Sequence, residues 1–253
     1  MNKSDRSPSY FVPQEVSDFF INGFNLLKIN AEDSPDRFFE ICENLNNNFL
    51  EDGYEWKEHY KTTEDLIPSE HNDERPSPFK YPYLLDFIFD QKFNIKINEL
   101  TGQELILGDM AVRRTMPSSK SYMRWHRDTH FYKNKEVIGR FPPIYKIILY
   151  IPSAELSSNQ INISPGGHLR YTNNRYLDIL LSLVRKKKMI KSSFEECMFF
   201  NTFVPHSVVQ KKKIIKNPSI RIIYNFCIKS QLNSFEGKEE LHDLYIKKHR
   251  ESL

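Results

Sequence analysis

Trp125-His126-Arg127-Asp128 stands near the middle of the chain, ahead of a strongly hydrophobic segment over residues 145–151. Side chains alternate between the two faces of a β-strand, so His126 and Asp128 share one face if this stretch is extended. One imidazole and one carboxylate can hold a single metal ion there and leave its opposite side open. The triplet alone has little specificity, because a surface histidine beside an aspartate usually has no function.

A second histidine, His206, adds a third potential ligand further along the chain. It follows Pro205 within an apolar segment, residues 196–209, that is typical of a strand and a turn. Two imidazoles and one carboxylate form the ligand set that binds Fe(II) on one side and keeps the remaining positions open. We therefore predict that His126, Asp128 and His206 are the metal ligands and the catalytic residues.

The order of these residues resembles that of the Fe(II)- and 2-oxoglutarate-dependent dioxygenases, and within them the phytanoyl-CoA dioxygenase-like family. The likeness covers roughly residues 100–230, together with residues 19–24. It is carried by Trp125-His126-Arg127-Asp128, residues 145–152, Ser164-Pro165-Gly166-Gly167-His168, Pro205-His206 and Arg221. The resemblance implies Fe(II) and O2 as cofactors and 2-oxoglutarate as the cosubstrate.

Arg221 is the residue that the resemblance assigns to the cosubstrate. Strand alternation puts it on the face of Ile223 and Asn225, where its guanidinium would hold the distal carboxylate of 2-oxoglutarate through two charge-assisted hydrogen bonds. The alternative is an edge-strand arginine paired with a surface glutamate. Arg221 lies farther from His206 than the family usually shows, which predicts an enlarged hairpin and leaves Lys216 open as another contact.

Lys146 is a second candidate for binding the cosubstrate, because it lies within the hydrophobic segment 145–151. It either faces inward with Ile148 and Tyr150, or it lies at the surface with only its aliphatic stem on apolar neighbours. The sequence favours neither placement.

Strand signals dominate the chain from residue 95 onward, behind helical signals nearer the N-terminus. We expect strands over residues 105–115, 122–128, 145–151, up to about 164, 198–204 and 220–228. We expect helices over residues 14–22, from Ser34 to just before Gly53, over 83–93 and over 174–189. The predicted fold is mainly β with α additions, a double-stranded β-helix (jelly roll, cupin-like) with N-terminal helices.

A single dioxygenase domain is expected over residues 1–253. Within it we expect a loose terminus over residues 1–12, a jelly-roll core at about 95–230 and a C-terminal helical tail at about 234–253. The polar, proline-bearing segment 58–80 is predicted to be a loop over one mouth of the fold, acting as a substrate lid.

The charge balance and the absence of long apolar runs exclude several kinds of partner. The 36 basic and 33 acidic residues leave a net charge of +3, which does not favour nucleic-acid binding. The basic runs at residues 185–188, which end a predicted helix, and 211–213, in the predicted hairpin, are expected to be solvated. No run reaches the ~20 apolar residues of a membrane span, and the first ten residues do not resemble a secretory signal.

Cysteine and histidine placement adds two further expectations. Cys42, Cys197 and Cys227 are expected to be reduced thiols, mostly buried, in a cytoplasmic protein with no membrane partner. His242 and His249 lie in a polar segment and are expected to be exposed.

The resemblance implies hydroxylation of a small-molecule metabolite, with release of succinate and CO2. Related halogenases replace the carboxylate ligand with a small residue, so Asp128 argues against halogenation. Basic residues near the motif favour an anionic substrate: Arg113, Arg114, Lys120, Arg124 and Arg127. Two alternatives stay open, namely a cupin-like metalloenzyme (an isomerase or epimerase) that acts without 2-oxoglutarate, and a catalytically silent jelly-roll binding protein.

Overall fold

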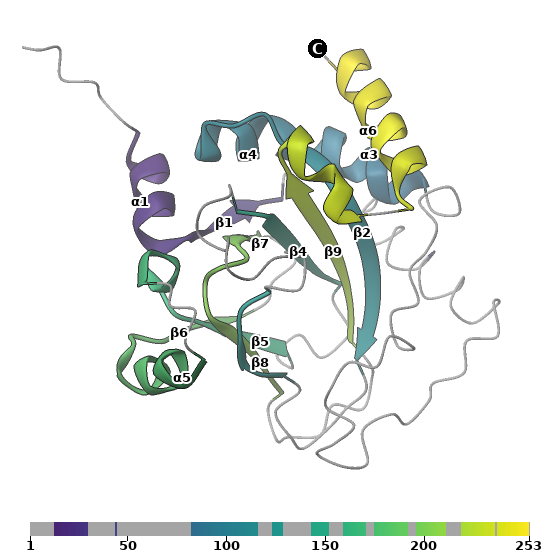
Figure 1. Cartoon of the computed structure of the whole chain (residues 1–253). Helices are drawn as coiled ribbons and strands as arrows, with labels where there is room; N and C mark the ends of the chain where they lie inside the picture. The colour runs from purple at the N-terminus through teal and green to yellow at the C-terminus, as the bar shows by residue number, and fades with distance from the viewer. Residues whose placement is uncertain are drawn as a thin grey trace, which may run out of the picture.

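Two antiparallel β-sheets form the centre of the molecule, and helices lie along one side of the larger sheet (Figure 1). The computed structural model describes residues 13–29, 44, 82–115, 123–128, 143–151, 159–170, 175–191, 196–210, 219–235 and 237–252. Antiparallel sheets with added helices are the fold class that the sequence predicts, and this part of the prediction is confirmed.

The larger sheet has five strands in the order β1-β7-β4-β9-β2, and the smaller sheet has four in the order β3-β8-β5-β6. All of their pairings are antiparallel. The strands of the larger sheet are β1 Phe24–Lys28, β7 Glu196–Asn201, β4 Tyr145–Ile151, β9 Ser219–Cys227 and β2 Ile106–Thr115. Those of the smaller sheet are β3 Met123–His126, β8 His206–Gln210, β5 Asn159–Ile163 and β6 Lys188–Lys191.

Alternation along the larger sheet divides the core into two layers. On β4, Ile147 and Leu149 belong to the apolar cluster beneath the helices, whereas Ile148 and Tyr150 belong to a second cluster. The second cluster also contains residues of the smaller sheet, such as Ile163. We call it the inter-sheet layer, because it fills the space between the two sheets.

Helices cover the other face of the larger sheet. They are α1 Gln14–Asn22, α3 Pro82–Asp90, α4 Phe93–Thr101 and α6 Glu239–Glu251. Tyr224 of β9 donates a hydrogen bond of 2.8 Å from Oη to the Leu84 carbonyl of α3. His242 of α6 donates from Nε2 to the Gly108 carbonyl of β2 at 3.0 Å and is buried, so the prediction that it is exposed is wrong.

The remaining described helices lie on connections. The 3-10 helix Gly167–Arg170 and α5 Arg175–Val184 lie between β5 and β6, and the 3-10 helix Lys229–Phe235 lies between β9 and α6. The predicted helix over 174–189 is too long, because Lys188 already begins β6. The basic run 185–188 therefore does not complete the last turn of a helix.

Two further local predictions are wrong. Strand signals were expected from residue 95, but Phe93, Ile97 and Leu100 recur at helical spacing and are buried on α4. A hairpin was expected between His206 and Arg221, but β8 belongs to the smaller sheet and β9 to the larger one. The connection between these strands is therefore a crossover from one sheet to the other.

Several predicted features lie outside the described residues, namely the terminus 1–12, the segment 58–80, the lysines within 211–216, Cys42, and the helix from Ser34 towards Gly53 apart from Asn44. Cys197 and Cys227 are buried free thiols, as predicted. In the part of the chain that the structure describes, no helix is both long and apolar enough to cross a membrane.

Candidate metal centre

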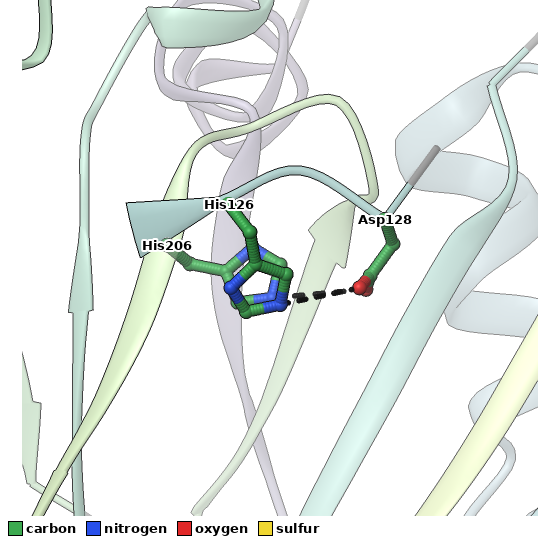
Figure 2. A group of neighbouring side chains, drawn as sticks. All are labelled: His126, Asp128 and His206. Carbon is green, nitrogen blue, oxygen red and sulfur yellow. Dashed lines mark ion pairs between the residues drawn. The ribbon is translucent and has the colours of Figure 1, made fainter. Parts of the chain in front are cut away.

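Three side chains from two segments far apart in the sequence meet beside the inter-sheet layer (Figure 2). His126 ends β3, Asp128 follows two residues later, and His206 begins β8. One ligand atom from each lies within 4.8 Å of the other two. The Asp128 Oδ1 atom is 3.4 Å from His126 Nε2, and its Oδ2 atom is 3.7 Å from His206 Nε2.

Strand pairing places the two imidazoles. His126 and His206 are direct partners in the antiparallel register of β3 and β8, and their ring centroids lie 4.3 Å apart. Neighbouring strands in a sheet are separated by about 5 Å, so paired residues on one face can share a ligand. The sequence could not give this pairing, because it predicts no separate strand β8.

Asp128 is placed by a turn rather than by strand alternation. The predicted strand reaches residue 128, but β3 ends at His126. The backbone N–H of Asp128 donates to the Thr202 carbonyl at 3.1 Å. Thr202 is itself fixed, because its hydroxyl and its N–H both donate to the Ile144 carbonyl, at 2.7 and 3.0 Å. The carboxylate is therefore held against the turn that joins β7 to β8.

Arg127 points away from the two ligands that flank it. Its Nη1 atom donates to the Gly167 carbonyl at 3.0 Å and to the Phe203 carbonyl. Arg127 was counted among the cations that favour an anionic substrate, but this contact gives it a structural role instead. Only strand alternation, which turns residue 127 to the face opposite His126 and Asp128, could have indicated that role from the sequence.

His206 is oriented to offer one nitrogen to a metal. Its Nδ1 atom lies 3.0 Å from the Val204 carbonyl, and because a carbonyl can only accept, Nδ1 carries the proton. Nε2 is left with its lone pair toward the centre. Burial, and then the neighbouring His126, lower the pKa of His206 to about 3, so the imidazole is neutral near pH 7.

Lys146 reaches the same centre from β4 in the larger sheet. Its Nζ atom forms a buried ion pair with Asp128 Oδ2. Burial alone would raise the pKa of Asp128, but Lys146, then His206 and His126, hold this pKa well below its usual value. Of the two placements that the sequence left open for Lys146, the structure has the inward one, with Asp128 as its partner.

Arg221 is located only through its backbone. It lies in β9, opposite Tyr150 of β4 and Arg113 of β2 in the register. Since β9 has neighbours on both sides, the alternative of an edge-strand arginine is wrong. Its side chain lies outside the described part of the structure, so the proposed contact with a cosubstrate stays a prediction.

The residues present fit a divalent metal ion. Two imidazole nitrogens and one carboxylate oxygen are the donors of the facial site that binds Fe(II). His206 is neutral and Asp128 ionised, which are the forms that ligate metals. The donor set and its protonation state therefore suit a single ion bound from one side.

No protein-family model matches the chain, and no curated protein matches it. Solved structures do match. EctD from S. alaskensis with bound Fe has a TM-score of 0.63 and 11% identity, over 91% of this chain and 80% of that chain. SnoK, a non-heme alpha ketoglutarate dependent carbocyclase from nogalamycin biosynthesis, has a TM-score of 0.61 and 10% identity, over 87% and 85%. The epimerase SnoN from the same biosynthesis has a TM-score of 0.60 and 10% identity, over 84% of this chain and 81% of that chain.

Two of these proteins have been crystallised with other ligands. EctD has been crystallised with 2-oxoglutarate and 5-hydroxyectoine, and SnoN with Fe3+, alpha ketoglutarate and nogalamycin RO. Identities this low establish a common fold and no more. The chain therefore shares its fold with EctD, SnoK and SnoN.

Proposed function

We propose that this protein is an Fe(II)- and 2-oxoglutarate-dependent oxygenase of the phytanoyl-CoA dioxygenase-like family, acting on a small-molecule substrate. The observation that carries the proposal is the meeting of His126, Asp128 and His206 beside two antiparallel sheets. The common fold with EctD, which binds Fe and 2-oxoglutarate, supports it. In this proposal the two sheets form the double-stranded β-helix expected from the sequence.

The three side chains would hold Fe(II) from one side and leave three positions for 2-oxoglutarate and O2. Bound iron would supply the oxidative decarboxylation of 2-oxoglutarate to succinate and CO2, coupled to oxidation of the substrate. The chain's own contribution is to keep His206 neutral through burial, to fix its tautomer through the Val204 carbonyl and to keep Asp128 ionised. The apolar inter-sheet layer beside them limits the access of water.

Arg221 is the proposed anchor for the distal carboxylate of 2-oxoglutarate. It precedes Ile223 by two positions on β9, and Ile223 lies in the inter-sheet layer. Alternation along the strand assigns both residues to one face. A guanidinium on that face could bind a carboxylate through two parallel hydrogen bonds.

Hydroxylation is the proposed outcome, and the presence of Asp128 argues against halogenation. A second candidate is epimerisation or ring closure, because SnoN is an epimerase and SnoK a carbocyclase. The two outcomes differ in the fate of oxygen. Hydroxylation places an atom from 18O-labelled O2 in the product, whereas epimerisation does not.

Succinate release tests the proposal before any substrate is known. Purified protein with Fe(II), ascorbate and 2-oxoglutarate should form succinate slowly, and His206→Ala should abolish this turnover. Truncating one partner of a buried charge pair costs about 2–5 kcal/mol, so Arg221→Ala should raise the apparent constant for 2-oxoglutarate at least about tenfold. Fe(II) should still bind to the Arg221→Ala protein.

Lys216→Ala is the matched control for Arg221→Ala. If the apparent constant for 2-oxoglutarate rises about tenfold in Lys216→Ala and not in Arg221→Ala, then Lys216 rather than Arg221 anchors the cosubstrate. A wild-type protein that binds metal but neither binds nor decarboxylates 2-oxoglutarate would favour the cupin-like metalloenzyme instead.

A further inference from the structure

The ion pair between Lys146 and Asp128 lies at the metal centre itself. Lys146 comes from the middle of the larger sheet, where Phe200 of β7 and Asn225 of β9 lie opposite it in the register. Only 8% of the residue is exposed, and Nζ is 5.9 Å from the centroid of the Phe200 ring. Burying an ammonium group is unfavourable unless it is paired, so its partner Asp128 accounts for its presence there.

We propose that Lys146 is a positioning residue: it directs a single oxygen of Asp128 to the metal and adds a positive charge that attracts a dianionic cosubstrate to the metal-loaded site. The second half of this inference rests on the proposed function. The first half concerns metal binding alone.

The two carboxylate oxygens of Asp128 have different surroundings. Oδ2 accepts from Lys146 Nζ, while Oδ1 lies 3.4 Å from His126 Nε2. An oxygen that already accepts from an ammonium group is a poorer metal ligand than the other oxygen of the same carboxylate. Lys146 therefore favours ligation through Oδ1 alone, and one-oxygen ligation keeps another coordination position open for exchangeable ligands.

Lys146 also changes the net charge of the side chains that would surround a bound metal ion. Asp128 contributes one negative charge and Lys146 one positive charge, while His206 is neutral. A divalent ion bound by Asp128 and two neutral imidazoles leaves one positive charge, and Lys146 raises this to two. The proposed anchor Arg221 adds another positive charge, so Lys146 strengthens the attraction of the loaded site for a dicarboxylate dianion such as 2-oxoglutarate. Lys146 therefore opposes the binding of the metal alone and favours the binding of the dianion that follows.

This reasoning predicts opposite changes in two affinities. Lys146→Met keeps the length and the apolar stem but removes the charge. It should bind Mn(II) about tenfold more tightly without cosubstrate, because a nearby repulsive cation is lost. The Mn(II)-loaded variant should bind 2-oxoglutarate at least about tenfold more weakly, because an attractive cation is lost. Lys146→Arg keeps the charge and should keep both affinities within about threefold of the wild type.

The experiment titrates the full-length protein with Mn(II) and then the loaded protein with 2-oxoglutarate, both without oxygen. Lys146→Gln replaces Lys146→Met if the latter does not fold. A variant in which both affinities fall together would show that Lys146 only maintains the structure, and the inference would be overturned. Tighter Mn(II) binding with an unchanged affinity for 2-oxoglutarate would overturn the half of the inference that concerns the cosubstrate.

If the proposed function is wrong, the titrations give a different result, because the wild type would not bind 2-oxoglutarate at all. The Mn(II) affinities of the wild type and Lys146→Met would still decide whether Lys146 acts on the metal site, since they need no cosubstrate.

Discussion

Arg127 determines the shape of the loop that carries two of the three ligands. Its guanidinium bridges the carbonyls of Gly167 and Phe203, which lie in the turns that follow β5 and β7. The second of these turns leads directly to His206. One side chain therefore links all three proposed ligands without touching the metal.

Replacing Arg127 should loosen the site. Arg127→Met removes two charge-assisted hydrogen bonds worth about 1.5–3 kcal/mol each, so the free energy of unfolding should fall by roughly 3–6 kcal/mol. Metal affinity should fall about 10- to 100-fold, as it does when groups that orient metal ligands are lost. Urea unfolding and Mn(II) titration measure the two effects. Arg127→Lys keeps the charge and should lose less, and wild-type metal affinity in Arg127→Met would contradict this role.

The residues of the site differ in how far the sequence could predict them. His126, Asp128 and His206 were predicted from side-chain chemistry and order alone, and the structure brings them together. The contact between Lys146 and Asp128 could not be predicted, because it depends on how the larger sheet lies against the loop after β3. From the sequence alone, Lys146 could face either the interior or the surface.

At the level of elements, Gly23 joins α1 to β1 beside the site. Its φ of +77° ends the helix, and its N–H donates to the Phe19 carbonyl at 2.7 Å. A Cβ atom here would lie 2.4 Å from His168 Nδ1 and 2.5 Å from Val204 Cγ2. The Val204 carbonyl accepts a hydrogen bond from His206 Nδ1, so a displacement of Val204 would also displace a proposed metal ligand.

We therefore expect Gly23→Ala to be strongly destabilising. A left-handed backbone costs an L-residue about 1–2 kcal/mol and overpacking adds about 1–3 kcal/mol, so thermal or urea unfolding should show a loss of about 2–5 kcal/mol. Gly102→Ala is the matched control, since Gly102 also has a positive φ but has no atom within 4 Å of an added Cβ. Equal losses in the two variants would show that the contacts with His168 and Val204 are unimportant.

Elements with clear boundaries were predictable, and connections between sheets were not. The helix Gln14–Asn22 and the strands β2, β4 and β9 agree with their predicted ranges to within a few residues, because capping, turn residues and apolar runs mark them. Strand β8 was merged with β7, and its connection to β9 was taken for a hairpin. Local patterns identify strands, but which sheet a strand joins depends on pairing with distant residues.

Across the whole molecule, the larger sheet separates a layer that stabilises the fold from a layer that holds the site. Phe199 faces the helices and stacks on Phe19 at 5.0 Å between ring centroids. Its neighbour Phe200 faces the other way and meets His206 edge to face at 5.0 Å. Both side chains are fully buried.

This division predicts different effects for two adjacent substitutions. Phe199→Leu and Phe200→Leu should each lower the free energy of unfolding by about 1–2 kcal/mol, because each leaves a cavity in a packed layer. Only Phe200→Leu should change metal affinity, because only Phe200 packs against a proposed ligand. Urea unfolding and Mn(II) titration of both variants provide the comparison. A larger loss of metal affinity in Phe199→Leu would show that the two layers do not act separately.

The most direct test of the whole account is the stoichiometry and affinity of Fe(II) binding, measured anaerobically on the wild type, His126→Ala and His206→Ala. The account predicts one Fe(II) per chain in the wild type. Each variant should lose affinity by more than about a hundredfold, since changes to residues that merely orient ligands already cost up to that amount. His249→Ala, on α6, is the control and should bind as the wild type does. Unchanged stoichiometry and affinity in both His126→Ala and His206→Ala would contradict the metal centre and the function built on it.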